Sequence, residues 1–166
     1  MARNLKFLFN LLILIFGLFF LFSLSAKGDP LEIIAYNLKY TLFKNNKLSW
    51  HLKAKKFVQK GKNYFEAESL FIFNPLKDVK IYGKRGIYNK MQNKFIIRGK
   101  VILKTSNKGE IYTEELIFYA DRNLIVSNRE VTVKKKDCII KGKGFVYDLN
   151  TENFKLKEKA WARFKL

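Results

Sequence analysis

The sequence predicts an all-β fold, either a β-solenoid or a jelly roll, on the basis of three observations. The first is one pattern that occurs three times, at residues 86–103, 117–133 and 145–162. Each copy has a strand ending in Tyr, a turn rich in Asn, Asp or Lys, and a second strand with a charged or Gly-containing break. The tyrosines, Tyr88, Tyr119 and Tyr147, lie 31 and 28 residues apart, as in stacked supersecondary units. Because such a unit cannot bury its apolar face alone, the copies are expected to share one elongated core.

The second observation is an alternation of apolar and polar residues with a period of two from Ile34 onward, which is typical of half-buried strands. The third is that no stretch after the first 26 residues has a helical period of useful length. In chain order, turns are expected at 44–47, 61–63 and 106–109, with a strand end at Asn74-Pro75. A change of phase near Glu68-Ser69 predicts a β-bulge.

The strands are expected to enclose an apolar interior, because one face of each is apolar and the other carries Lys, Glu, Asn and Thr. That pattern requires two sheets, or one rolled sheet, closed over a shared interior. The inward residues singled out are Tyr40, Trp50, Phe65, Ile81, Tyr88, Phe95, Ile97, Tyr119, Phe145, Tyr147 and Phe154. The alternation leaves open whether these side chains line a ligand groove or only pack against each other.

The N-terminal segment from Phe7 to Leu24 is apolar and long enough to cross a bilayer as a helix. A cleaved signal peptide is the alternative, with small residues at Ser23 and Ser25, although its apolar region is usually only about 7–15 residues long. The expected organisation is a cytoplasmic tail and transmembrane helix at 1–26, a linker at 27–33 and a β domain at 34–166. The flanking charges are too similar to settle the orientation.

The chain is strongly basic, with a formal net charge of +19 over 166 residues. The first 26 residues hold two basic and no acidic residues, which leaves 31 basic and 14 acidic residues, or about +17, on the remainder. This excess indicates contact with nucleic acid, lipid head groups or lipid-linked phosphate. Alternatively, the lysines coat strand faces and protect sheet edges from aggregation.

No catalytic, metal or cofactor site is expected. His51, the only histidine, lies on a polar strand face, and the single Cys138 cannot form an internal disulfide. The pairs Glu66/Glu68 and Glu114/Glu115 have no base, nucleophile or metal ligand at a useful spacing. The Gly-rich segments 83–86 and 142–144 lack the features of a phosphate loop and instead suggest bulges or close backbone approach. Nucleic acid is disfavoured because the aromatic residues fall on the face opposite the lysines.

The order of these elements resembles the LptC family of lipopolysaccharide export. The resemblance covers nearly the whole chain and rests on residues 48–56, 83–88 with 95–101, 111–116, and 142–148. It implies a twisted β-jelly roll of stacked antiparallel hairpins in the periplasm, held to the cell inner membrane by one transmembrane helix, without enzymatic activity. The implied partners are lipopolysaccharide, an LptBFG-like ABC transporter complex that extracts it, and an LptA-like periplasmic bridge protein.

The resemblance also assigns roles to residues. The eleven inward side chains named above would hold acyl chains, while the phosphorylated sugars stay outside. The last strand, 154–166, would dock the bridge protein, with Leu156, Ala160, Ala162 and Phe164 inward across a bulge at Lys157–Lys159. Two alternatives remain: a soluble LptA-like bridge with a cleaved signal, and a membrane-anchored module that binds surface polyanions and carries no lipid.

Overall fold

The computed structural model describes residues 32–44 and 47–164. The expected transmembrane segment lies outside these residues, and among them no helix is long and apolar enough to cross a membrane. The described residues form nine strands. In order they are β1 (Glu32–Lys44), β2 (Lys47–Lys60), β3 (Tyr64–Asn74), β4 (Val79–Asn89), β5 (Lys94–Thr105), β6 (Gly109–Tyr119), β7 (Leu124–Lys135), β8 (Cys138–Asp148) and β9 (Phe154–Phe164).

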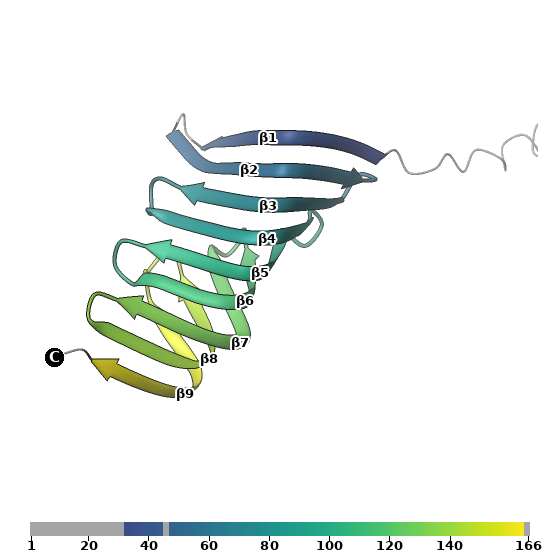
Figure 1. Cartoon of the computed structure of the whole chain (residues 1–166). Helices are drawn as coiled ribbons and strands as arrows, with labels where there is room; N and C mark the ends of the chain where they lie inside the picture. Colours follow the sequence, from purple (N-terminus) through teal and green to yellow (C-terminus); the bar gives the residue numbers. More distant parts are fainter. Residues whose placement is uncertain (1–31, 45–46, 165–166) are drawn as a thin grey trace, which may run out of the picture. The chain divides into compact units, whose positions relative to one another are not determined.

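All nine strands belong to one antiparallel sheet, in which each strand pairs with the next along the chain (Figure 1). Of the two arrangements that the alternation allowed, the single rolled sheet is therefore the one observed. The all-β prediction is confirmed for the described residues, and the sheet is consistent with the expected jelly roll. Consecutive hairpins need only short turns, which explains why the repeats follow each other so closely in sequence.

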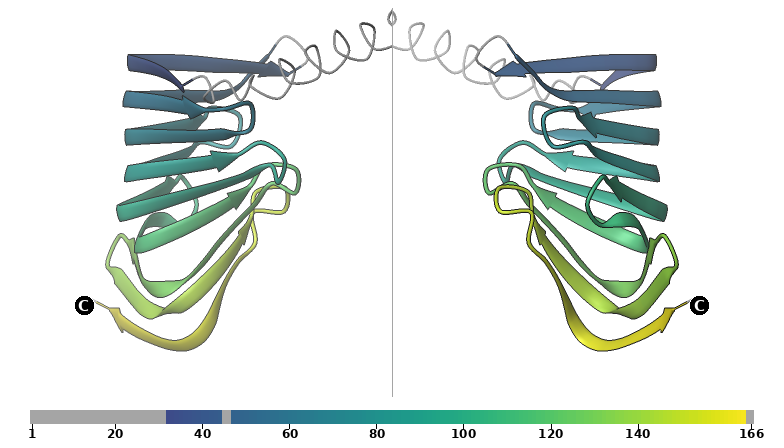
Figure 2. Two further views of the ribbon diagram at one scale, coloured as in Figure 1. Left: turned by 90° about the vertical axis from the view of Figure 1, so that its right-hand side faces the viewer. Right: turned by 90° about the vertical axis from the view of Figure 1, so that its left-hand side faces the viewer.

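The strands bend in their middle, along a line that we call the crease. The pairing register shifts there in five successive strand pairs, from β4–β5 to β8–β9. Several crease residues have positive φ, namely Ser69 (53°), Gly99 (80°), Lys100 (49°), Gly144 (67°) and Lys159 (40°). In Figure 2 the last strands are bent sharply, so that two limbs of each strand enclose an interior. The predicted change of phase at Glu68-Ser69 is present, with a positive φ at Ser69, but the pairing register of β3 with β2 and β4 does not shift there, so the predicted one-residue bulge is not observed. The charged or Gly-containing breaks of the repeats are the crease itself.

The crease divides the sheet into two leaves. The first leaf holds the strand halves joined by the β3–β4, β5–β6 and β7–β8 turns, and the second leaf holds the halves joined by the β2–β3, β4–β5, β6–β7 and β8–β9 turns. The inner face is the one that carries the fully buried apolar side chains, and the outer face is the other. Gly86 lies on the inner face at the crease, where an added Cβ would come within 2.5 Å of Leu70 Cδ2, so a larger residue would force the two apart.

The core lies between the leaves over the middle strands. Ile81, Leu103 and Ile111 come from the first leaf and have no exposed surface, and Ile97 and Phe145 from the second leaf are equally buried. Contact between the leaves is direct, since Trp50 on β2 packs against Phe118 on β6 with ring centroids 5.0 Å apart. The middle of the inner face is therefore a packed core.

Candidate functional site

Two rows of mostly apolar side chains cross the inner face. Directly opposed residues of an antiparallel sheet point to the same side, so the register lists each row strand by strand. The row in the first leaf, which we call the aliphatic row, is Tyr40, Leu52, Ile72, Ile81, Leu103, Ile111, Val133, Ile140 and Ala162. It contributes one apolar residue from every strand, without interruption.

The row in the second leaf, the aromatic row, is Ile33, Gln59, Phe65, Tyr88, Phe95, Phe118, Ile125, Tyr147 and Phe154. Ring centroids along it are 5.8 Å apart from Phe65 to Tyr88, 4.1 Å from Tyr88 to Phe95 and 6.0 Å from Phe95 to Phe118. Stacked rings at these distances attract each other beyond the effect of burial alone. The row forms an apolar surface across the sheet that is broken only by Gln59.

The two rows are covered in the middle of the sheet and open at its ends. Ile81 and Leu103 are fully buried, whereas Tyr40, in the same row on β1, is 56% exposed. At the other end Phe164, on the inner face of β9, is 69% exposed. The ends are exposed because β1 and β9 are edge strands with one neighbour each. An elongated apolar ligand would thus meet the rows first at an edge strand, and the centre would have to open to admit it.

The structure places ten of the eleven inward residues on the inner face. Phe65, Tyr88, Phe95, Tyr147 and Phe154 belong to the aromatic row, Tyr40 and Ile81 to the aliphatic row, and Trp50, Ile97 and Phe145 pack beside them.

Tyr119 is the exception, and its expected inward orientation is corrected. It is opposed to Lys94 and Leu124 on the outer face, with the Lys94 Nζ 5.9 Å and the Arg122 Cζ 4.9 Å from its ring centre. The inward residue at this place in the repeat is its neighbour Phe118.

Phe118, which is 3% exposed, is therefore a member of the row that the repeat alignment missed. The alternation of β6 could have identified Phe118. If inward positions are counted from the end of the two-residue break at Glu114-Glu115, they fall on Leu116 and Phe118. Phe57 was also missed, although its ring lies 5.8 Å from that of Phe65. The repeat is thus marked by Tyr88, Phe118 and Tyr147 rather than by three tyrosines.

The last strand carries the expected edge residues. The register sets Leu156 opposite Phe145, Ala162 opposite Ile140 and Phe164 opposite Cys138, which puts these side chains on the inner face. The predicted bulge at Lys157–Lys159 is confirmed by the register shift in this strand pair and by the positive φ of Lys159. Ala160, Ala162 and Phe164 are exposed, and Leu156 is half-buried.

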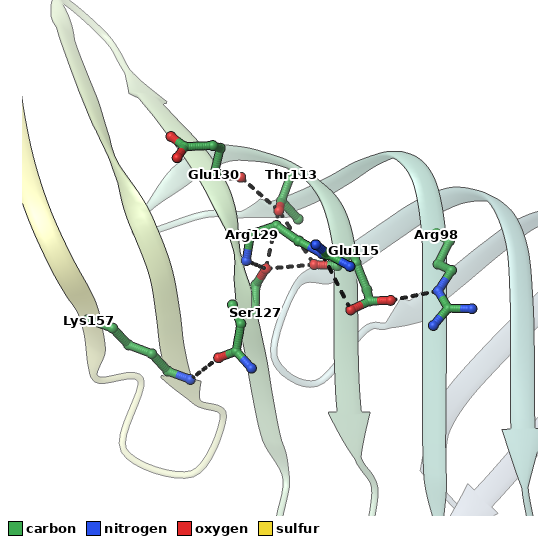
Figure 3. A network of polar contacts seen from close by, with 8 residues as sticks. Arg98, Thr113, Glu115, Ser127, Arg129, Glu130 and Lys157 are labelled. Carbon is green, nitrogen blue, oxygen red and sulfur yellow. Dashed lines mark hydrogen bonds and ion pairs between the residues drawn. The ribbon is translucent and has the colours of Figure 1, made fainter.

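A polar network holds the crease across β5, β6 and β7 (Figure 3). The Glu115 carboxylate accepts a hydrogen bond from Arg98 Nε at 2.6 Å and lies 3.8 Å from Arg129 Nε. The buried Ser127 hydroxyl donates a hydrogen bond to the Glu115 backbone carbonyl at 2.7 Å and accepts one from the Arg129 backbone amide at 3.1 Å. These bonds satisfy backbone groups that the bulges release from the sheet ladder, so the bend is fixed rather than loose.

The inner face favours uncharged side chains. Burial, and then the Tyr40 phenol, raise the pKa of Tyr88, and burial likewise raises the pKa of Tyr147. A low-polarity environment disfavours phenolate, which is the physical cause of both shifts. Around these two phenols the inner face therefore disfavours a charged group.

On the outer face, a shallow groove of mixed charge lies over β1 to β5 in the second leaf. Its floor contains Val58, Ile87 and Ile96, and charged side chains of both signs surround it. Lys60 donates to Glu66 there at 3.0 Å, and this hydrogen bond raises the pKa of Lys60. Four basic and three acidic residues line the groove, so its net charge is small and it offers no strong preference for an ionic ligand.

Among the residues that the structure describes, no group of three or more His, Cys, Asp or Glu residues could hold a metal ion. His51 contacts Thr41 through a 3.0 Å hydrogen bond at the exposed end of β2. What the described residues do provide is an extended apolar surface with two open edges.

Comparisons with known proteins give a family and a similar solved structure. The family model described as "Lipopolysaccharide-assembly, LptC-related" matches residues 11–165. Among solved structures, the chain is similar to LptH of Pseudomonas aeruginosa, described as the LptA homologous periplasmic component of the conserved lipopolysaccharide transport device. That similarity has a TM-score of 0.49 at 10% identity and covers 82% of this chain and 96% of that one. A comparison with curated proteins finds no match.

Proposed function

This chain belongs to the LptC-related family of lipopolysaccharide-assembly proteins, and we propose that it carries lipopolysaccharide through the periplasm along the inner face of its sheet. In this proposal the chain accepts the lipid from an inner-membrane ABC extractor and passes it to a periplasmic bridge protein. The family match supports lipopolysaccharide transport as the general role, and the proposal adds the path and the direction.

The observation that carries the proposal is the aliphatic row. It provides an apolar residue on each of nine consecutive strands, and both of its ends are exposed. Strands in a sheet lie about 4.8 Å apart, so a row across nine strands extends roughly 40 Å, longer than an acyl chain. Because hydrocarbon leaves water favourably, acyl chains are the part of the lipid that this surface would hold.

The anchor and the two edges complete the proposal. Residues 1–26 would form the cytoplasmic tail and transmembrane helix, 27–33 a linker, and 34–166 the periplasmic domain. Edge strands have unpaired N–H and C=O groups that can take an added strand. The bridge protein would therefore add to β9 beside Ala162 and Phe164, which continues the inner face into the partner.

A soluble bridge with a cleaved signal would use the same inner face. It differs only in its N-terminus, so sequencing the mature protein from membranes separates the two: a start near Met1 supports the anchor, and a start at Ala26 supports the soluble form. A polyanion-binding module without lipid would leave the inner face empty, and it is therefore separated by the following test.

The test uses neighbouring aromatic residues that point to opposite faces. Phe65 lies on the inner face and Tyr64 on the outer face of the same strand. A photo-crosslinking phenylalanine at Phe65 is expected to capture lipopolysaccharide in cells, and the same group at Tyr64 is the matched control. Phe154, on the inner face of the edge strand β9, and Lys155, on its outer face, repeat the comparison near the open edge. Equal capture at inner and outer positions would contradict the proposal.

A further inference from the structure

The outer faces of the two leaves differ sharply in charge. Two register rows cover the first leaf: Lys39, Lys53, Phe71, Tyr82, Ile102, Tyr112, Thr132, Lys141 and Trp161, and Thr41, His51, Phe73, Lys80, Lys104, Glu110, Lys134, Ile139 and Arg163. These rows, which we call the basic aromatic face, hold seven basic residues and one acidic residue.

The corresponding two rows of the second leaf are balanced. They contain three basic residues, Lys60, Lys94 and Lys155, and three acidic residues, Glu32, Glu66 and Asp148. If the lysines only protected the sheet from aggregation, the outer faces of both leaves would be expected to carry a similar excess of positive charge. The excess charge on one of two otherwise similar faces therefore indicates an anionic partner for that face.

The same face carries aromatic rings among its lysines, so the expectation that the aromatic residues lie opposite the lysines is wrong for this face. The ammonium groups of Lys53, Lys80 and Lys134 lie 6.0, 5.4 and 4.8 Å from the ring centres of Phe71, Phe73 and Tyr112. Trp161 and Tyr82 are 55% and 36% exposed. Lysine stems and aromatic rings that share a surface place apolar atoms below and charges above, which is the arrangement found at membrane–water interfaces.

We propose that the basic aromatic face lies against an anionic phospholipid surface, with its lysines and Arg163 among the head groups and with Trp161 and Tyr82 at the hydrocarbon boundary. Basic residues near an anionic bilayer are attracted to it, and aromatic rings favour the interface. This contact goes beyond lipid transport, because it involves the outer face and does not depend on what the inner face carries.

Nucleic acid fits the face less well. Base stacking needs aromatic faces that are free. Lysine ammonium groups already lie over the rings of Phe71, Phe73 and Tyr112. A membrane needs only the exposed rings at Trp161 and Tyr82 together with a distributed positive charge. The membrane is therefore the partner to which the proposal commits.

The two tryptophans of the chain provide the test. Trp161 reports on the basic aromatic face, and Trp50 reports on the inner face. The full chain carrying Trp50→Phe is placed in nanodiscs of brominated phosphatidylcholine, with or without phosphatidylglycerol. Bromine quenches tryptophan only at close range. We expect Trp161 emission to be quenched in the anionic discs, and the quenching to disappear in neutral discs and at high salt.

Matched charge removal identifies the face. Lys53→Gln, Lys134→Gln and Lys141→Gln together are expected to lower the equilibrium constant for the membrane-bound state about a hundredfold, since each basic residue near an anionic surface contributes about fivefold. The control combines Lys60→Gln, Lys94→Gln and Lys155→Gln, removes the same charge from the second leaf, and should leave quenching unchanged. Equal loss in the two triple variants, or quenching in neutral discs, overturns the proposal. The proposal is also overturned if a single-stranded oligonucleotide changes the emission of Trp161 and anionic discs leave that emission unchanged.

Discussion

The Trp50 and Phe118 rings lie 5.0 Å apart although their strands, β2 and β6, are separated by three others in the sheet. Trp50 belongs to the first leaf and Phe118 to the second, so the contact joins the two leaves across the inner face. Trp50 lies on β2, the strand next to the open β1 edge, and Phe118 lies on β6 in the buried centre of the sheet. Any elongated ligand that enters from that edge would have to pass this aromatic pair.

Replacing Phe118 by alanine should therefore weaken the closure of the roll. Phe118 is 3% exposed, and truncation of such a buried ring costs about 3–5 kcal/mol. Urea unfolding of Phe118→Ala measures this loss. In a Trp161→Phe background, the emission of Trp50 should also move to longer wavelength as water reaches its ring. Phe118→Leu keeps most of the volume and should cost less than about 1.5 kcal/mol. A Trp50 spectrum unaffected by Phe118→Ala would contradict the contact.

The buried hydroxyl at the crease gives a second prediction. Ser127 is 2% exposed and bonds to the Glu115 carbonyl and the Arg129 amide. Ser127→Ala leaves both groups without this partner and should lower the free energy of unfolding by about 1–3 kcal/mol. Ser106→Ala, in an exposed turn, is the control and should stay within about 0.5 kcal/mol of the parent. Similar urea midpoints for the two variants would show that the crease does not need the hydroxyl.

Alkaline pH should destabilise the fold through its buried phenols. Burial raises the pKa of Tyr147, so the folded protein keeps the phenolic proton more strongly than the unfolded chain does. The resulting stabilisation is complete below the unfolded pKa of about 10 and is lost as the pH rises through the folded pKa. Tyr147→Phe should consequently lose less stability than the parent between neutral pH and pH values above about 10. Urea unfolding of the parent and of Tyr147→Phe across this pH range measures the difference, and equal losses in the two proteins would contradict the prediction.

Docking at β9 can be tested with a residue that has no backbone donor. Proline lacks an N–H and is poorly tolerated within a sheet. Ala162→Pro, or truncation after Lys159, is expected to abolish capture of the bridge protein while association with the extractor persists. Ala162→Ser retains the N–H and serves as the control, and circular dichroism checks that each variant is folded. Capture that survives both changes would move the docking edge to β1, between Ile34 and Leu42.

Much of the sheet follows from the sequence alone. Alternation with a period of two determined which residues of most strands face inward, including Phe65, Ile81 and Phe95. Interruptions of that alternation located the change of phase at Glu68-Ser69 and the bulge at Lys157–Lys159, where Ser69 and Lys159 have positive φ. These features are local, because successive side chains of a strand point to opposite faces whatever its neighbours are.

Tertiary structure decided the rest. It set Phe118 rather than Tyr119 on the inner face, it buried Ile81 while leaving Tyr40 exposed in the same row, and it gave the two outer faces different charges. The common cause is pairing between distant residues: the crease shifts register in each strand separately, and burial depends on which leaf lies opposite. A strand's own sequence specifies two faces, but only the closure of the sheet specifies what covers each of them.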